Sequence, residues 1–295
     1  MPSPASPRLL LDSPSLFYRA FFALPVSIRD PRGRSTNAVH GYLDMTSTLL
    51  RDRQPGGLVH AFDVDWRPAW RVAAYAGYKS QRRPDPPELP PQLDVIRAVL
   101  DAAGMQCAGC DGYEADDVLA TIAAEATPDT PVEVVTGDRD LLQLVRDPEV
   151  TVLFTVRGVS QLARFDEAAV RAKYGVGPQQ YADFAILRGD PSDGLPGIRG
   201  IGEKTASRLI ARYGSLDALM AERASQPAQI AAALRHGTEY ITAMRTVVPV
   251  CVTTAYTLTP LREPDVTRLD ELAAEHGIRG PVTRLLAVLG APSLP

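Results

Sequence analysis

The sequence predicts an α/β fold, with a central, mostly parallel sheet flanked by helices and a mostly helical C-terminal region. Three observations support this prediction. Short apolar runs alternate with helical patterns in the first half of the chain, which is typical of a parallel sheet covered on both faces. Strand-like runs become sparse after about residue 166. The chain has 295 residues, of which 45% are apolar, as expected of a globular protein.

The alternation is carried by six segments. Four short apolar runs predict buried strands: Arg8–Asp12, Leu58–Asp63, Val132–Thr136 and Val150–Thr155. Between them, the spacing of apolar residues predicts helices over Gln92–Ala103 and Ala115–Ala126. The proline-dense segment Asp85–Pro91 predicts an irregular connection.

The second half of the chain predicts helices. Helical patterning continues into the tail, over Thr267–Gly277 and Val282–Gly290. We expect a boundary near Ala172, so that residues 1–172 form an α/β domain and residues 173–295 form a helical region.

Composition argues against several classes of protein. No run approaches the roughly 18–20 apolar residues of a membrane-spanning helix, and the Pro/Ser-rich start, MPSPASPRLLL, lacks the features of a secretory signal. We therefore expect a cytoplasmic protein with no membrane partner. Cys107 and Cys110 form a CxxC without a second pair, which favours buried thiols over metal or redox use. Nucleotide-binding glycine motifs and motifs for a Ser-His-Asp or Cys-His site are absent.

Acidic residues recur where the predicted strands end or helices begin. Asp12 and Asp63 end strands, Glu114, Asp116 and Asp117 begin a helix, Asp138 and Asp140 follow a strand, and Asp190 and Asp193 lie in GDPSDG. Taken singly, each has an ordinary interpretation as a cap or a turn residue. In a parallel sheet, however, the carboxyl ends of the strands share one edge, so we expect these acids to converge.

Carboxylates gathered this closely would repel one another unless cations lay between them. Oxygen ligands suit Mg²⁺ or Mn²⁺, and a pair of such ions supports phosphoryl transfer. The pattern therefore predicts a site for two or more divalent metal ions. Net charge is −4, but without these nine acids 31 basic residues face 26 acidic ones, so the rest of the chain is mildly basic.

The stretch from Trp66 to Arg83 is basic and aromatic. It contains Arg67, Arg71, Lys79, Arg82 and Arg83 interleaved with Trp66, Trp70, Tyr75 and Tyr78. Aromatic rings stack on unpaired bases and cations follow phosphates, so this composition favours a single-stranded nucleic acid as ligand. A solvated basic helix with core-facing aromatic residues is the alternative.

These motifs together resemble the 5′ nuclease family, which includes flap endonucleases and the 5′–3′ exonuclease domain of bacterial DNA polymerase I. The matching segments are LLLDSPSLFYRAFFALP, AFDVDWRPAWR, YKSQRRPDPPELPPQ, GYEADDVLATIA, VVTGDRDLLQLV and GDPSDGLPGIRGIGEKTASRLI. They span roughly residues 8 to 217 in family order. The resemblance implies a PIN-like catalytic domain with a helical arch at about residues 66–92.

The resemblance also assigns roles. The family's metal-binding acids match the nine acids Asp12, Asp63, Glu114, Asp116, Asp117, Asp138, Asp140, Asp190 and Asp193. Lys79 and Arg82 resemble the catalytic cations that contact the scissile phosphate. Tyr78 resembles the aromatic residue on which the 5′ strand stacks, and Arg19 and Arg83 are expected to bind DNA. Ser13 and Pro14 replace the Gly-Asn of many members, and QRR replaces a common histidine-containing version after YKS.

GIRGIGEKTASRLIARYG resembles the family's helix–three-turn–helix, expected at about residues 181–217. Gly197, Gly200 and Gly202 would let the backbone approach a duplex phosphate, and amides near Lys204 and Thr205 would hold it. The family often binds K⁺ here, so a potassium site is a further expectation. An ordinary helical hairpin is the alternative on spacing alone.

The implied function is a structure-specific 5′ nuclease, acting as flap endonuclease and 5′–3′ exonuclease in DNA replication and repair by a two-metal mechanism. The expected partner is DNA with 5′ flaps, junctions or ends, bound by a monomer in the bacterial cytosol. A DNA polymerase or sliding clamp is left open as a protein partner. Two other functions stay open: a non-catalytic protein that binds branched DNA, and a PIN-like ribonuclease.

Overall fold

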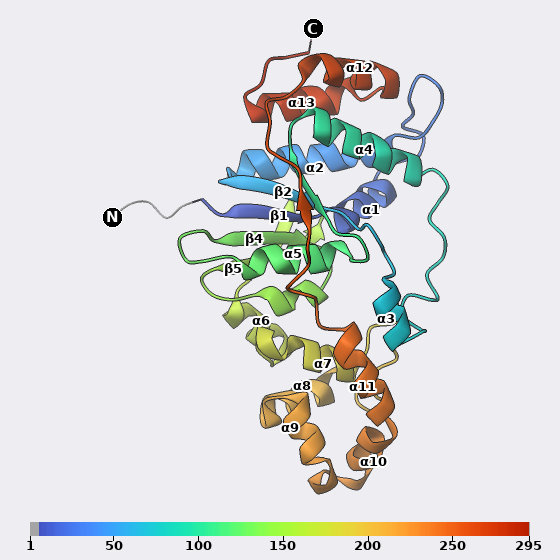
Figure 1. Ribbon diagram of the computed structural model, residues 1–295, viewed down its shortest axis with the longest axis vertical. Helices are drawn as coiled ribbons and strands as arrows, with labels where there is room; N and C mark the ends of the chain where they lie inside the picture. Colours follow the sequence, from blue (N-terminus) through green and yellow to red (C-terminus); the bar gives the residue numbers. More distant parts are fainter. Residues whose placement is uncertain (1–5, 295) are drawn as a thin grey trace.

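A seven-stranded sheet forms the middle of the molecule in the computed structural model, which describes residues 6–294 (Figure 1). The strand order is β6-β5-β4-β1-β2-β3-β7, with the five inner strands parallel and both edge strands antiparallel. The strands are β1 Arg8–Asp12, β2 Gly57–Ala61, β3 Gln106–Gly109, β4 Val132–Thr136, β5 Val150–Arg157, β6 Gln161–Phe165 and β7 Thr257–Leu258.

Two hydrophobic cores lie on opposite faces of this sheet. Successive side chains of a strand point to opposite faces, so Leu9 and Leu11 join one core and Leu10 joins the other. The first core is closed by α1 (Ser13–Ala23), α2 (Asn37–Arg53), α4 (Pro90–Ala102), α12 (Val266–His276) and α13 (Arg279–Leu289). The second is closed by α5 (Ala115–Ala124) and the helices between β6 and β7.

The helices between β6 and β7 form the part of the molecule drawn below the sheet in Figure 1. They are α6 Glu167–Tyr174, α7 Tyr181–Arg188, α8 Glu203–Tyr213, α9 Leu216–Ala221, α10 Ala228–His236 and α11 Thr238–Val247. The remaining helices are the short α3, Ala69–Ala74, and two 3-10 helices that concern the site, η1 Asp140–Leu144 and η3 Pro191–Asp193. The predicted α/β class with a helical second part is confirmed.

The tail does not stay with these helices. After α11 the chain runs back past the sheet, where β7 pairs antiparallel with β3, and then forms α12 and α13 beside α2 and α4 (Figure 1). This differs from the expectation that residues 173–295 form one helical region, because α12 and α13 bury their apolar residues against α2 and α4. The division near Ala172 remains a prediction, and α6 runs through that position.

Individual boundaries were predicted unevenly. The strands Arg8–Asp12 and Val132–Thr136 are confirmed, whereas β2 ends at Ala61 and β5 continues to Arg157. The segment expected to be irregular up to Pro91 already contains the start of α4, because proline fits the first turn of a helix.

Cys110 is buried, whereas Cys107 and Cys251 are half-buried, and all three are free thiols. The Pro/Ser tail at residues 1–5 lies outside the described residues. Among residues 6–294, no helix has the length and apolar content of a membrane span.

Candidate metal centre and nucleic-acid interface

The nine predicted acids come from five segments and meet at the carboxyl edge of the parallel strands. A cavity of about 830 Å³ lies at this edge. Six of the nine line it, namely Asp12, Asp63, Glu114, Asp116, Asp138 and Asp190. Asp117 and Asp140 do not line it, but besides burial the charge of Asp116 raises the pKa of Asp117 and the charge of Asp138 raises the pKa of Asp140. The charge of Asp193 raises the pKa values of both Asp138 and Asp140. The topology therefore joins all nine through short-range electrostatics, although they do not share one open surface.

Asp12 lies where β1 passes into α1. Its Oδ2 accepts a hydrogen bond from Thr136 Oγ1 at 2.5 Å, and its Oδ1 accepts one from the Ser15 amide at 3.2 Å. Thr136 is within reach because β1 and β4 are hydrogen-bonded neighbours. Burial raises the pKa of Asp12 to about 7, and the charges of Asp138 and Asp63 add to this shift although the Thr136 bond opposes it.

Glu114, Asp116 and Asp117 begin α5, and their carboxylate oxygens include a set within 4.8 Å of one another. Asp117 Oδ2 accepts the amide of Glu114 at 3.4 Å, so the helix start itself fixes this spacing. Asp63 Oδ1 accepts the Ala115 amide at 2.7 Å, which brings the end of β2 to the same place. Burial and the charge of Asp116 raise the pKa of Glu114 to about 8, although Lys79 and Arg71 oppose the shift.

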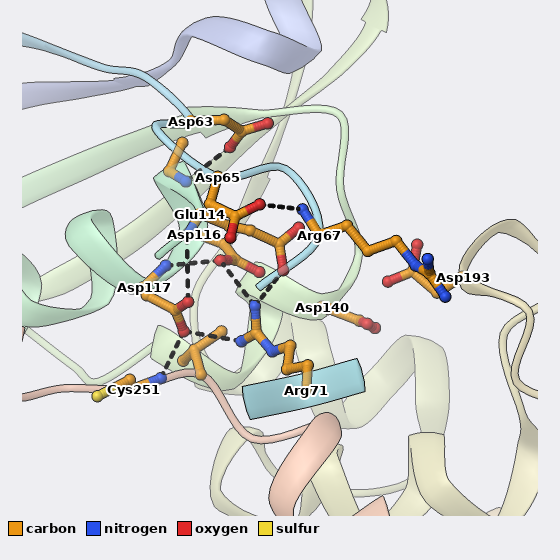
Figure 2. A network of polar contacts seen from close by, with 12 residues as sticks. Asp63, Asp65, Arg67, Arg71, Glu114, Asp116, Asp117, Asp140, Asp193 and Cys251 are labelled. Carbon is orange, nitrogen blue, oxygen red and sulfur yellow. Dashed lines mark hydrogen bonds and ion pairs between the residues drawn. The ribbon is translucent and has the colours of Figure 1, made fainter. Parts of the chain in front are cut away.

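Arg71 provides the largest difference from the sequence prediction. We expected it to follow phosphates, but its side chain is 1% exposed and points from α3 into the α5 acids (Figure 2). It donates to Glu114 and, at 2.7 Å, to Asp117 Oδ1, and it lies 3.6 Å from Asp116. Arg71 is thus a buried counter-cation of the acidic group. Its position in a basic, aromatic stretch gave no signal of this burial.

The remaining acids surround η1 and the turn after α7. Asp138 Oδ1 accepts the Asp140 amide at 2.8 Å, and Asp190 Oδ1 accepts the Ser192 amide at 2.8 Å. Burial, together with the charges of Asp138, Asp190 and Asp193, raises the pKa of Asp140 well above its ordinary value. Its buried Oδ1 has no hydrogen-bond partner within the described part of the chain.

These properties fit a hard divalent cation. The donors are all oxygens, a combination that Mg²⁺ and Mn²⁺ prefer. The raised carboxyl pKa values indicate that the protein's own cations do not balance the charge of the acids. A bound metal cation would favour the ionised forms of these carboxyls and so lower their pKa values. The unpartnered Asp140 oxygen supports the same conclusion. The assignment of individual residues as metal ligands remains a prediction.

Two predicted phosphate-binding cations already have partners. Lys79 has a φ of 51°, its amide donates to the Asp193 carbonyl at 2.8 Å, and its ammonium donates to Glu114. Arg82 Nη2 donates to Asp193 Oδ1 at 2.6 Å. Both residues line the cavity, as does Arg83. The segment between α3 and α4 is therefore attached to the acids and to the turn after α7.

The side chains of Tyr78 and Arg19 also have partners within the protein, unlike side chains that are free to contact DNA. The Tyr78 side chain is buried and its hydroxyl donates to Glu114 Oε2 at 2.7 Å, so the ring is not available for stacking in this conformation. Arg19 donates to the Thr155 carbonyl at 3.2 Å. By contrast, Trp66 is 50% exposed and lines the cavity, which makes it better placed to stack on a base. The roles of Tyr78 and Arg19 remain predictions.

The segment predicted to form a helix–three-turn–helix contains α7, η3 and α8, with a glycine-rich turn between η3 and α8. Its identity as that motif remains a prediction. Gly197 has a φ of 68°, and a Cβ there would lie 2.5 Å from the Arg188 carbonyl, so this glycine serves internal packing. Gly200, with a φ of 88°, and Gly202 would place a Cβ in open space. These two positions leave room for an external group to approach the backbone.

The start of α8 faces the same open space. Gly202 is its N-cap, and Lys204, which is exposed, and Thr205, which is half-buried, lie in the first turn. The first amides of a helix have no intrahelical partners and favour an anion. The geometry therefore suits a phosphate, whereas the potassium site remains a prediction.

Comparison with known proteins identifies relatives over nearly the whole chain. A family model described as "5'-3' exonuclease, N-terminal resolvase-like domain" matches residues 7–175, and one described as "5'-3' exonuclease, C-terminal SAM fold" matches residues 176–267. A 5'-3' exonuclease of Streptomyces coelicolor is 45% identical, covering 96% of this chain and 100% of the relative. One of Mycobacterium tuberculosis is 42% identical, covering 96% and 98%. DNA polymerase I of Mycobacterium bovis is 51% identical over 73% of this chain but only 24% of the polymerase.

Solved structures share the fold at low sequence identity. The T5 D15 protein co-crystallized with metal ions superposes with a TM-score of 0.65 and 15% identity, covering 96% of this chain and 98% of that one. The catalytic core of Rad2 in complex with DNA substrate gives a TM-score of 0.60 and 15% identity, covering 97% and 92%.

Proposed function

The chain belongs to the 5′–3′ exonuclease family, and on this premise we propose that it is a metal-dependent, structure-specific 5′ nuclease that hydrolyses phosphodiester bonds in DNA. Its relatives are named 5'-3' exonucleases, and structural neighbours include nucleases solved with metal ions or with DNA. The substrates proposed for this chain are 5′ flaps, junctions and ends.

One observation carries the proposal: acids from five segments, of which Asp12, Glu114 and Asp117 are buried, gather around one cavity that is also lined by basic side chains. Burying so many carboxylates is unfavourable unless positive charge compensates them. Arg71 and Lys79 compensate only part of the group, because the pKa values of Asp12, Glu114 and Asp140 remain raised. This arrangement costs stability and is of a kind that is common at functional sites.

We propose Mg²⁺ or Mn²⁺ as the compensating cations, held by Asp12, Glu114 and Asp138 with support from the other acids. When bound, such ions supply charge neutralisation and water activation for phosphoryl transfer. The chain's own cations act beside them: Lys79 and Arg82, now paired with Glu114 and Asp193, can exchange these partners for the scissile phosphate.

Binding is divided between two further surfaces. Arg83 and the half-exposed Trp66 at the cavity suit the phosphates and bases of an unpaired 5′ strand. The turn at Gly200 and the first amides of α8 suit a duplex phosphate. A potassium ion at this turn, a monomeric state and an intracellular setting in DNA replication and repair belong to the same proposal.

A labelled DNA flap tests the function. With Mn²⁺, we expect release of the 5′ flap as a short product, and with EDTA we expect no cleavage. A shifted but uncut substrate in Mn²⁺ would contradict the proposal and favour a branched-DNA-binding protein. Faster cleavage of an RNA flap of equal sequence would instead favour a ribonuclease.

A further inference from the structure

After α11 ends at Val247, the chain passes close to the acids before it reaches β7. We call residues 248–254 the return segment. Within this segment the side chain of Thr254 is buried, and those of Val250 and Cys251 are half-buried. It therefore connects the helical part of the molecule to the region of the candidate metal centre (Figure 1).

Two consecutive amides of the return segment bind two different groups. The Cys251 amide donates to Asp117 Oδ1 at 2.8 Å, a contact drawn in Figure 2. The Val250 amide donates to Gln143 Oε1 at 3.1 Å. The first contact reaches the acids at the start of α5, and the second reaches η1, which begins at Asp140.

Gln143 completes the link to Asp140. Its Nε2 donates to the Asp140 carbonyl at 2.8 Å and to the Val248 carbonyl at 3.4 Å. The Gln143 side chain thus joins η1 to the return segment. Its Nε2 donates to a carbonyl of each, and its Oε1 accepts an amide of the return segment. The amide of glutamine is needed for this, because it carries both functions.

Thr121 makes the corresponding link on the α5 side. Its hydroxyl donates to the Asp117 carbonyl at 2.9 Å and accepts the Thr254 amide at 3.0 Å. The Thr121 side chain is buried, so these contacts are protected from water. Both acidic groups are therefore attached to the same seven residues of the return segment.

The helix that leads into the return segment also contacts the proposed DNA-binding elements. Tyr240 of α11 accepts the Gly197 amide of the glycine-rich turn at 3.1 Å. The same ring meets Tyr75, which directly follows α3, edge-on at 6.1 Å between centroids. Helix α11 thus contacts both the glycine-rich turn and the segment that follows α3, and the return segment that extends it contacts both acidic groups.

We propose that the return segment sets the separation between the α5 acids and the η1 acids, with Gln143 and Thr121 as positioning residues. This inference rests on the proposed metal site. Neither residue touches the metal or the substrate in it. They hydrogen-bond to the backbone carbonyls of Asp117 and Asp140 and so fix the positions of these two residues. Groups that orient metal ligands in this way commonly affect metal affinity strongly.

The test measures Mn²⁺ binding by electron paramagnetic resonance in wild type, Gln143→Met and Thr121→Val. Methionine keeps the length of glutamine without its amide, and valine keeps the shape of threonine without its hydroxyl. Gln226→Met is the matched control, because Gln226 is a buried glutamine bonded to Tyr213 within the helical part. A closed dumbbell duplex, which has no free 5′ end, measures DNA affinity in EDTA.

We expect Gln143→Met and Thr121→Val each to weaken Mn²⁺ binding by about tenfold or more, with dumbbell affinity unchanged and Gln226→Met equal to wild type. If Gln143→Met does not fold, Thr121→Val decides. Wild-type Mn²⁺ affinity in the folded variants, or an equal loss in Gln226→Met, would overturn the inference alone. Absence of Mn²⁺ binding by the wild type would overturn the proposed function as well.

Discussion

The acidic cavity and the glycine-rich turn are built on opposite principles. At the cavity, side chains such as Asp12 and Glu114 are buried, and several elements hold them in place. At the turn, Gly200 and Gly202 expose backbone to open space and offer no buried charge. The difference indicates that the proposed chemistry is placed where many contacts fix a few side chains, whereas the proposed duplex contact uses backbone that must remain accessible.

This comparison predicts that changes in the two regions have separable effects. A substitution at the cavity should change cleavage or metal binding and spare duplex affinity. A substitution at the turn should do the reverse. The following predictions run from the largest expected effect to the smallest.

Asp140→Asn should cause the largest loss. It removes a charge from the acidic group around the cavity, so flap cleavage in Mn²⁺ should fall about a thousandfold, the upper range for losing one electrostatic contact to a transition state. Binding of the closed dumbbell duplex should stay near wild type. Single-turnover kinetics and fluorescence anisotropy measure the two quantities. Asp52→Asn, at an exposed pair with Arg51, is the control. Unchanged turnover in Asp140→Asn would contradict the role of the acids.

Arg71→Met should destabilise the metal-free protein. Removing one partner of a buried charge group leaves the others uncompensated, at a cost of about 3 kcal/mol in the free energy of unfolding. Urea unfolding in EDTA measures this cost, and Mn²⁺ should recover part of it by supplying positive charge. Arg268→Met, which breaks an exposed pair with Glu271, should change stability little. Equal effects of the two substitutions would show that Arg71 is not a counter-cation.

Gly200→Val should weaken duplex binding without changing Mn²⁺ affinity. The φ of 88° strains any larger residue, and the new side chain would occupy the open space at the turn. We expect about tenfold weaker binding of the dumbbell duplex, or roughly 1.4 kcal/mol. Gly290→Val is matched, since Gly290 has a φ of 67° and open surroundings at the end of α13. A parallel loss of Mn²⁺ affinity would remove the distinction between the regions.

The pH dependence of stability should be the smallest effect. Asp12 and Glu114 have pKa values raised to about 7 and about 8 by burial. A carboxyl with a raised pKa contributes stability below its ordinary pKa, and this is lost as pH rises through the folded value. In EDTA the melting temperature should therefore fall between about pH 5 and pH 8. Mn²⁺ should reduce that fall, whereas a rise in EDTA would contradict the assigned pKa directions.

Sequence was most informative where local chemistry determines structure. The strands Arg8–Asp12 and Val132–Thr136 were predicted because buried parallel strands form continuous apolar runs. The short β3 and β7 were not predicted, since four and two residues carry no periodic signal. The acids could be located because parallel topology brings strand ends to one edge.

Contacts between distant segments were beyond sequence reasoning. Arg71 looks like any other cation of a basic stretch, and its burial depends on α3 packing against α5 acids more than 40 residues away. The return segment shows the same limit, because Cys251 contributes only its backbone amide to Asp117. Every residue except proline has a backbone N–H, so the amino-acid type does not indicate which group this N–H binds. The partner is found only in the three-dimensional structure.

The central claim is that scattered acids meet at one cavity to hold divalent cations. Anomalous scattering from crystals soaked in Mn²⁺ tests it most directly. The account predicts peaks inside the cavity, next to the carboxylates of Asp12, Glu114 and Asp138. Mn²⁺ bound elsewhere with an empty cavity, while Arg71 and Lys79 stay paired with Glu114, would contradict it.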